Sequence, residues 1–518
     1  MFVCFLTGSQ DFPDYVKIGG DPAQKRLFSS HRTGVGRCVF PAAVIYSKGI
    51  QSPRGEERRR SMVSFLKEAA QVRPTQKQLD WFDMEMYAFV HFSPNTFTDL
   101  EWGNGDEPES IFDPKKLNCD QWVEAVKSAG MKGLVLTAKH HDGFCLWPTR
   151  TTEHSVKNSP LGRDVVKEAA EACRRGGIKF GFYLSPWDRN APCYGTPAYN
   201  DFFCEQLTEL LTGYGDIFYV WFDNACGEGP NGRKQEYDFP RYFELIRKYQ
   251  PGAVIFNDFG PDVRWCGNEA GTARYAEWAV VPTELCHYAQ AQTGPGPLAG
   301  EGDLSYLYNT AQEIGAMPNI LYSKGLAFVP AEIDMSIRPG WFWHPHEEPH
   351  SLERLFRTYL DSVGNNACFH LNIPPNREGL FDPRDVARLK EFGDLVQREL
   401  GTPLPAQVEQ VPGCPATQAR YTIAFPQPQR GVKYVVLQED LAQGQRVESF
   451  RIVGEFASGR EYVLFQGTCI GHKRICRLKD PYEGQNPLTV DGNPYLRRLQ
   501  VHITAARDEV ALQNIQVF

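Results

Sequence analysis

Short apolar runs alternate with segments of helical periodicity between residues 61 and 400. The runs cover residues 87–92, 133–138, 180–184, 217–222, 253–256 and 368–372. Within each run the residues are almost continuously apolar, which is typical of strands in a parallel sheet that is covered on both faces. Strands that alternate with helices in this way predict a fold of the α/β class.

Two architectures of that class fit the pattern, a (β/α)8-like TIM barrel and an open doubly wound sheet. We favour the barrel for residues 61–400 because the length and the number of strand–helix units suit it. In addition, the first strand is not followed by the glycine-rich phosphate-binding turn that many doubly wound sheets carry.

Polar residues and glycines mark the ends of two of the intervening helices. Asn118 is placed to cap a helix that Gly130 would end. Asp164 is placed to cap the next one, which Gly176 and Gly177 would end.

The two ends of the chain follow different patterns. Residues 1–60 mix Gly, Pro and Arg without periodicity, and we expect an irregular N-terminal extension there. Residues 401–416 are rich in proline and predict a linker. Residues 417–518 show short alternating segments separated by glycines, which predicts a C-terminal β-sandwich domain.

The composition narrows the possible partners and the compartment. The chain has 518 residues, and 55 Lys and Arg against 63 Asp and Glu give a formal net charge of −8. An acidic chain is a poor ligand for nucleic acid, and the apolar runs are too short to cross a membrane, so we expect neither partner. The chain shows no clear signal peptide and no N-glycosylation sequon, which favours the cytoplasm. A secreted or lysosomal enzyme whose start was predicted incorrectly is the alternative, and the oligomeric state stays open.

Polar and aromatic residues gather where the apolar runs end. His91, the pair His140 and His141, Tyr183 and Asp223 all lie at or just after the end of a run. In a parallel barrel the active site lies at the C-terminal ends of the strands, so these side chains are the candidates for chemistry.

A metal site and a sugar site could both use such residues. Adjacent residues of a strand point to opposite faces, so His140 and His141 should not both bind one metal ion unless the chain bends there. Tryptophans beside the strand ends, such as Trp102, Trp187 and Trp221, favour a sugar, because indole covers the apolar face of a sugar ring. We therefore expect no metal and no organic cofactor.

Six motifs occur along the barrel segment in one order. They read HFSPNTFTDLEWGNG, LTAKHHDGFCLWPT, GFYLSPWDRN, YVWFDNACGEGPNG, GPDVRWCGNEAG and EIDMSIRPGWFWHP. In these motifs the chain resembles the α-L-fucosidase family of glycoside hydrolases, family 29, over residues 61–400. The segments QEDLAQGQRVESFRI and GTCIGHKRICRL resemble the C-terminal β-sandwich of that family.

The resemblance implies an exo-acting fucosidase that retains the configuration of the sugar through a covalent fucosyl-enzyme. Asp223 matches the nucleophile, and Glu269 matches the acid/base of the subgroup that acts on α-1,3- and α-1,4-linked fucose. The residues that match the family's fucose-binding side chains are His91, Glu101, Trp102, His140, His141, Tyr183, Trp221 and Trp341. Trp221 and Trp341 match the aromatics that pack on the ring and its methyl group, and the implied partner is a fucosylated oligosaccharide or glycoconjugate.

Several alternatives remain at this point. Asp258, Asp262, Glu332 and Asp334 are also acidic, lie near strand ends and compete with Glu269 for the role of the acid. Asn224 follows the nucleophile where relatives commonly have glycine, and its side chain could disturb the turn. A fucose-binding, lectin-like protein that has lost turnover is the rival function, although such a protein does not need the proton donor Glu269.

Overall fold

The computed structural model describes residues 65–258, 260–285, 313–317, 319–481 and 495–518, and the predicted extension 1–60 lies outside these ranges. No helix in the described residues is long and apolar enough to span a bilayer. The cysteines in these ranges are all free thiols.

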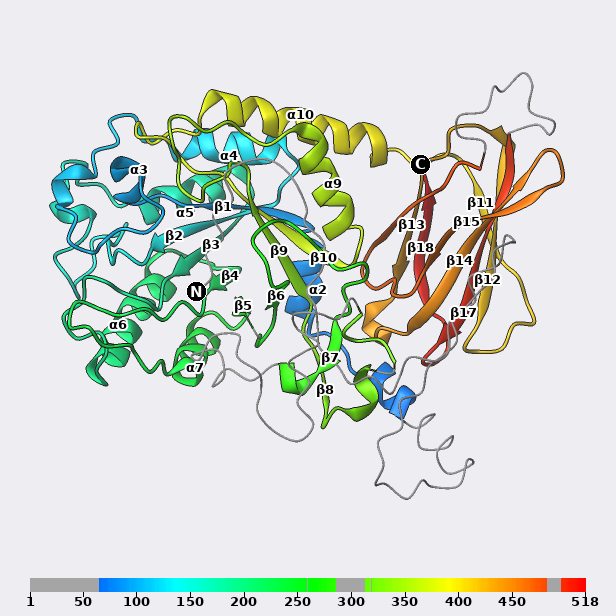
Figure 1. Cartoon of the computed structure of the whole chain (residues 1–518), viewed down its shortest axis with the longest axis horizontal. Coiled ribbons are helices and arrows are strands. Elements are labelled where there is room, and N and C mark those ends of the chain that lie inside the picture. The colour runs from blue at the N-terminus through cyan, green and yellow to red at the C-terminus, as the bar shows by residue number, and fades with distance from the viewer. Residues whose placement is uncertain (1–64, 259, 286–312, 318, 482–494) are drawn as a thin grey trace, which may run out of the picture. The chain divides into compact units, whose positions relative to one another are not determined.

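Eight parallel strands form a nearly closed barrel (Figure 1). They are β1 (Met86–Val90), β2 (Gly133–Lys139), β3 (Lys179–Leu184), β4 (Tyr219–Trp221), β5 (Val254–Phe256), β6 (Arg264–Trp265), β9 (Ala331–Ser336) and β10 (Ala367–Asn372), and their order is β5-β4-β3-β2-β1-β10-β9-β6. A parallel bridge between Phe256 and Val263 joins the two ends of the sheet. The predicted TIM-like barrel is therefore confirmed, and each of the six predicted runs contains a strand.

Helices surround the barrel strands in Figure 1. They are α4 (Cys119–Ser128), α5 (Val165–Gly176), α6 (Ala198–Gly213), α7 (Phe239–Tyr249), α9 (Leu352–Ser362) and α10 (Pro383–Leu400), preceded by the short α2 (Gln76–Phe82) and α3 (Asn95–Thr98). The Asn118 side chain accepts a hydrogen bond from Gln121 N, and Asp164 accepts one from Lys167 N, so both predicted caps are present. Gly177 ends α5 in the left-handed conformation at φ 70°.

Two strands of the barrel, β6 and β9, were not predicted from the sequence. β9 reads AEIDMS, so charged Glu332 and Asp334 interrupt the apolar pattern that identifies a covered strand. Both side chains point into the barrel, where other polar groups meet them, and both are buried. β6 is only two residues long and contains the buried Arg264, which pairs with Glu277.

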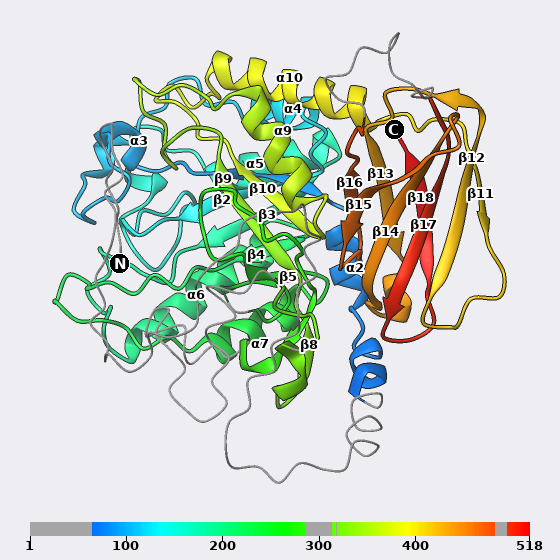
Figure 2. The ribbon, with the colours of Figure 1, turned by 45° about the vertical axis from the view of Figure 1, so that its right-hand side comes forward.

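The C-terminal region consists of two antiparallel sheets that share one apolar core (Figure 2). The strands β11 (Gln407–Gln410), β12 (Ala419–Gln429), β17 (Leu496–Ala506), β14 (Val447–Phe456) and β15 (Glu461–Gly467) form one sheet, in that order. The strands β16 (Arg474–Arg477), β13 (Tyr434–Glu439) and β18 (Leu512–Val517) form the other. The structure differs from the predicted linker 401–416, because β11 lies within it and pairs with β12.

Hydrogen bonds connect the sandwich to the barrel segment. Gln445 Oε1 accepts hydrogen bonds from the backbone nitrogens of Ala279 and Val280, at 3.0 and 3.1 Å. The Tyr275 hydroxyl donates to the carbonyl of Gln466, and Arg474 Nη1 donates to the carbonyl of Tyr275. The Gln445 and Arg474 side chains are buried and Tyr275 is exposed, and together these contacts brace the segment that follows β6.

Candidate active site

The ten residues singled out from the sequence lie together at the C-terminal ends of the barrel strands. His91 follows β1, Glu101 and Trp102 follow α3, His140 and His141 follow β2, Tyr183 is in β3, Trp221 ends β4, Asp223 follows it, Glu269 follows β6 and Trp341 follows β9. Hydrogen bonds or ring contacts link each of them to at least one other member of the group.

Asp223 is held by two donors directly after β4. Its Oδ2 accepts a hydrogen bond of 2.6 Å from the Tyr183 hydroxyl, and its Oδ1 accepts one of 3.2 Å from Ala225 N. Burial raises the pKa of Asp223 to about 7, and the nearby charges of Asp258 and Glu269 add to the rise, while the two hydrogen bonds oppose it. The carboxyl group therefore changes its charge near neutral pH.

His141 is fixed in one tautomer. The Ser185 hydroxyl donates to the carbonyl of Trp187 at 2.7 Å, so its oxygen accepts a hydrogen bond from His141 Nδ1, also at 2.7 Å. Burial lowers the pKa of His141 to about 3, which leaves the ring neutral with a lone pair on Nε2. That nitrogen lies 3.7 Å from Asp223 Oδ2, beyond hydrogen-bond distance.

His140 lies beside His141, contrary to the expectation from strand geometry. β2 ends at Lys139, and its pairing with β3 is irregular between Thr137 and Lys139, so the alternation of a regular strand no longer applies. The two ring centroids are 4.1 Å apart, and His140 also contacts the rings of His91 and Tyr183. Burial holds the pKa of His140 well below its usual range, so this ring is neutral too.

Asn372 orients His91. Asn372 Nδ2 donates to Ser336 Oγ at 2.9 Å and to the carbonyl of Trp341 at 2.8 Å, which leaves Oδ1 facing His91. Oδ1 accepts hydrogen bonds from the backbone nitrogen of His91 and from its Nδ1, at 3.2 and 2.9 Å. Burial lowers the pKa of His91 to about 3, so Nε2 again carries a lone pair.

Glu101 connects the loop after β1 to the loop after β9. Its carboxylate accepts hydrogen bonds from the backbone nitrogens of Trp341 and Phe342, at 2.9 and 3.2 Å. His344 Nε2 lies 2.7 Å from Glu101 Oε1, and His344 Nδ1 lies 2.6 Å from Asp99 Oδ1. Burial opposes protonation of His344, but these two carboxylates raise its pKa, so the ring favours its charged form.

Trp102 is the most exposed aromatic of the group, with 51% of its surface accessible. Its ring meets His141 and Trp187 edge to face, with centroids 5.9 and 5.8 Å apart. It therefore offers a free apolar surface beside a neutral imidazole.

Glu269 lies next to Trp341, whose indole Nε1 donates to Glu269 Oε2 at 3.1 Å. Loss of water around the carboxyl group raises its pKa, the Trp341 hydrogen bond opposes the rise, and the charge of Glu101 adds to it. The carboxyl group is therefore biased toward its protonated form relative to a free glutamate.

The other acids differ in their positions. Asp262 is held by Arg247 and Lys77 in ion pairs of 2.7 and 3.0 Å. Glu332 and Asp334 lie inside the barrel on β9. The charge of Asp258 is among the largest causes that raise the pKa of Asp223, and burial raises the pKa of Asp258 itself to about 7.

Asn224 fits the turn after Asp223 without strain. Glu85, Asp99 and Asn366 are the non-glycine residues of the described chain that have positive φ, so position 224 does not require glycine. Asn224 Oδ1 accepts a hydrogen bond of 2.9 Å from Asn257 Nδ2. The side chain therefore joins the neighbouring loop.

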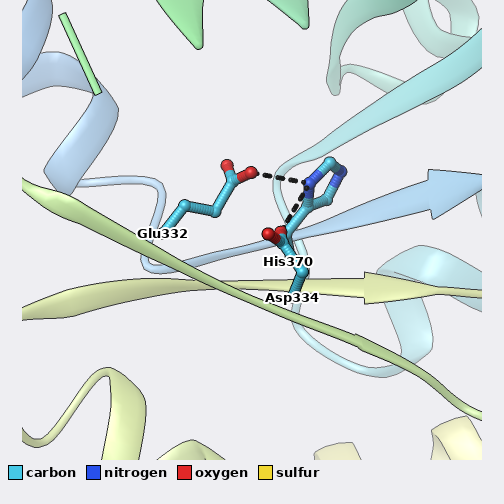
Figure 3. A group of neighbouring side chains, drawn as sticks. All are labelled: Glu332, Asp334 and His370. Carbon is cyan, nitrogen blue, oxygen red and sulfur yellow. Dashed lines mark hydrogen bonds and ion pairs between the residues drawn. The ribbon is translucent and has the colours of Figure 1, made fainter. Parts of the chain in front are cut away.

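Glu332, Asp334 and His370 form the one group in the described residues that could hold a metal ion, since a ligand atom from each lies within 4.8 Å of the others (Figure 3). Protein donors already fill the carboxylate of Glu332. Its Oε2 accepts hydrogen bonds from the hydroxyls of Tyr219 and Tyr87, and its Oε1 accepts one from Trp221 Nε1. A metal ion would have to share these oxygens.

Sequence reasoning missed Asn372, Ser185 and His344, which orient the predicted residues. Asn372 ends the apolar run 368–372, and His344 belongs to the WFWHP motif, so both carried a positional signal. Their partners come from distant parts of the chain, and only the folded barrel reveals those pairings.

Comparisons with known proteins agree on one family. The model of the α-L-fucosidase family matches residues 65–399. α-L-fucosidase 1 of Arabidopsis thaliana is 38% identical over 450 residues, which cover 81% of this chain and 84% of that protein. The structure of a Ruminococcus gnavus family 29 fucosidase in complex with fucose has a TM-score of 0.74 at 28% identity, covering 86% of this chain and 95% of that one. A family 29 glycoside hydrolase from a rumen bacterium has a TM-score of 0.73 at 36% identity, covering 86% and 77% of the two chains.

The geometry predicts that His91 and His141 stay neutral with the proton on Nδ1 over the whole range from pH 5 to 8, because their pKa values are lowered to about 3. Nitrogen NMR of protein labelled at histidine measures this, with His91→Gln and His141→Gln to assign the signals. Protonation of either ring near pH 6, as in a free histidine, would contradict the lowering of its pKa by burial.

Proposed function

The chain belongs to the α-L-fucosidase family of glycoside hydrolases, and on this premise we propose that it removes terminal α-1,3- or α-1,4-linked L-fucose from branched glycans with retention of configuration. The observation that carries the proposal is the carboxyl group of Asp223, held by Tyr183 and Ala225 among neutral imidazoles at the end of β4. A second carboxyl group, that of Glu269, lies near enough to raise the pKa of Asp223.

Two steps complete the proposed reaction. In the first, a carboxylate oxygen of Asp223 attacks the anomeric carbon while Glu269 gives its proton to the departing glycosidic oxygen, which forms a covalent fucosyl-enzyme. In the second, Glu269 takes a proton from water, the water oxygen attacks the anomeric carbon, and Asp223 leaves as a carboxylate. Retention requires the two carboxyl groups to lie about 5 to 5.5 Å apart in the reacting complex.

The ionisation of the site supports these roles. Tyr183 and Ala225 donate to Asp223 and stabilise the charged form that a nucleophile requires, against the burial that raises its pKa to about 7. Loss of water and the charge of Glu101 raise the pKa of Glu269, as a proton donor requires. Asp258 is the competing acid, and Glu269 is preferred because it lies in the motif that matches the family's acid/base.

Neutral imidazoles suit the hydroxyl groups of fucose. The Nε2 atoms of His91 and His141 carry lone pairs, so each can accept a hydrogen bond from a sugar hydroxyl. The Glu101 carboxylate would accept hydrogen bonds from further sugar hydroxyls. Trp102, Trp221 and Trp341 supply apolar surface for the ring and its methyl group.

The linkage preference rests on Glu269. In Gly-Asn-Glu-Ala it follows β6 on a loop, which can approach the leaving-group side of the sugar. The Trp341 indole donates a hydrogen bond to that carboxyl group. In a branched substrate, the sugars other than the terminal fucose would lie beyond Glu269 and Trp341.

We predict that Asp223→Ala abolishes hydrolysis of both a Lewis-type trisaccharide and an aryl α-L-fucoside, and that Glu269→Ala slows the trisaccharide about 10²- to 10⁴-fold. Azide should restore cleavage of the aryl fucoside by Glu269→Ala, because azide can replace water where general base help is missing. Asp394→Ala, on the exposed face of α10, serves as the control and should match wild type.

Two results would count against the proposal. Wild-type protein that binds L-fucose and cleaves neither substrate favours the lectin-like alternative. Full activity in Glu269→Ala together with loss in Asp258→Asn would move the acid/base role to Asp258.

Tyr183→Phe should shift the acidic limb of the kcat/KM profile to higher pH. The Tyr183 hydroxyl lowers the pKa of Asp223, so without it that pKa rises above about 7 and less of the nucleophile is ionised at neutral pH. We expect a loss of about tenfold or more at pH 7. Tyr214→Phe, which removes a hydroxyl bonded to Asp164, is the matched control. If the acidic limb of the kcat/KM profile stays at the same pH in Tyr183→Phe, that limb does not report the ionisation of Asp223.

A further inference from the structure

A buried cluster of ionisable groups lies inside the barrel, next to the candidate active site. It consists of Glu332 and Asp334 on β9 and His370 on β10, which lie side by side in parallel pairing (Figure 3). The exposed fractions of the three residues are 0%, 2% and 0%. Burial of ionisable groups costs free energy unless hydrogen bonds or opposite charges compensate for the lost water. We therefore ask what this cluster contributes to the site.

The three groups balance one another in charge. His370 Nδ1 lies 3.2 Å from Glu332 Oε1 and 3.5 Å from Asp334 Oδ1. Burial disfavours the charged imidazole, but the two carboxyl groups raise the pKa of His370 to about 9. Burial and the charge of Glu332 hold the pKa of Asp334 well above its usual range, so Asp334 is neutral while Glu332 and His370 form an ion pair.

Glu332 also connects this ion pair to aromatic residues of β1 and β4, of which Trp221 forms the floor of the candidate sugar site. Its Oε1 accepts a hydrogen bond of 2.8 Å from Trp221 Nε1, and its Oε2 accepts one of 2.5 Å from the Tyr219 hydroxyl and another from that of Tyr87. Trp221 Nε1 is the only polar atom of the indole, so this hydrogen bond fixes the rotation of the ring about its side-chain bonds.

Trp221 transmits that orientation to the reacting groups. Its indole stacks on Phe256 with centroids 4.5 Å apart and planes at 6°, and it meets the Tyr183 ring edge to face at 5.0 Å. Tyr183 in turn donates to Asp223, and Trp221 precedes Asp223 by two residues on the same strand end. His370 makes a second contact upward, because its ring stacks on Phe89 at 4.3 Å, and Phe89 touches His91.

We propose that Glu332 is a positioning residue that acts through the indole N–H of Trp221, which sets the aromatic floor of the sugar site and the place of Tyr183 beside Asp223. The inference rests on the proposed function, since it assumes that Trp221 faces the sugar. Glu332 itself lies below that floor and touches no substrate.

A double-mutant cycle tests this role in the full-length protein. Glu332→Gln keeps the size of the side chain but removes the charge, and Trp221→Phe removes the N–H while keeping a ring. Each variant should lower kcat/KM for an aryl α-L-fucoside about tenfold or more. The double variant should be no worse than the less active single variant, because Trp221→Phe removes the hydrogen bond whose charged acceptor Glu332→Gln replaces with a neutral one. Glu439→Gln, at a buried carboxylate of the sandwich, is the matched control and should leave kcat/KM unchanged.

A measurement on the unaltered cluster covers the case in which Glu332→Gln does not fold. With nitrogen-labelled tryptophan, the indole N–H of Trp221 is assigned by its absence from the spectrum of Trp221→Phe. It should exchange with deuterium far more slowly than the indole N–H of exposed Trp102.

Three outcomes would overturn the inference while wild type remains an active fucosidase. They are normal kinetics in a folded Glu332→Gln variant, losses that multiply in the double variant, and exchange of the Trp221 N–H as fast as that of Trp102. A stoichiometric metal ion bound by Glu332 would also overturn it, because the ion would compete with Trp221 Nε1 for Glu332 Oε1. Inactive wild type would instead contradict the proposed function itself.

Discussion

The side chains inside the barrel are buried, and each ionisable group there needs a hydrogen bond or an opposite charge. This constraint explains how the site is built. At the end of β4, hydrogen bonds from Tyr183 and Ala225 stabilise the carboxylate of Asp223. Deeper in the barrel, Glu332 accepts hydrogen bonds from tyrosines and a tryptophan while His370 balances its charge.

The same constraint determines the state of the histidines. His91 and His141 are buried beside one fixed acceptor each, Asn372 Oδ1 and Ser185 Oγ, and so they hold one proton on Nδ1. Both rings are neutral, so each Nε2 can accept a hydrogen bond from a sugar hydroxyl. His344, in contrast, lies between two carboxylates and favours its charged form, so it links the loops that carry Glu101 and Trp341.

The sequence predicted those parts of the fold and site that depend on local pattern. Apolar runs located six barrel strands, and the caps Asn118 and Asp164 were correct because a cap acts within one turn. β9 was missed because Glu332 and Asp334 are buried against partners from other strands, which no local pattern reveals. His140 and His141 lie side by side because β2 ends at Lys139, so the alternation of a regular strand does not extend to them. Asn372 and His344 could be assigned a role only once the folded chain brought them to their partners.

If Asp223 is the nucleophile, it forms a covalent bond to the sugar, and that intermediate can be trapped. A fucosyl fluoride that carries fluorine at C2 should react quickly with the protein and release its sugar slowly, because the fluorine destabilises both transition states and the fluoride leaving group speeds the first step. We expect a mass increase of one sugar on the peptide that contains Asp223. A label on Asp258 or Glu269, or turnover with inversion and no labelled peptide, would contradict it.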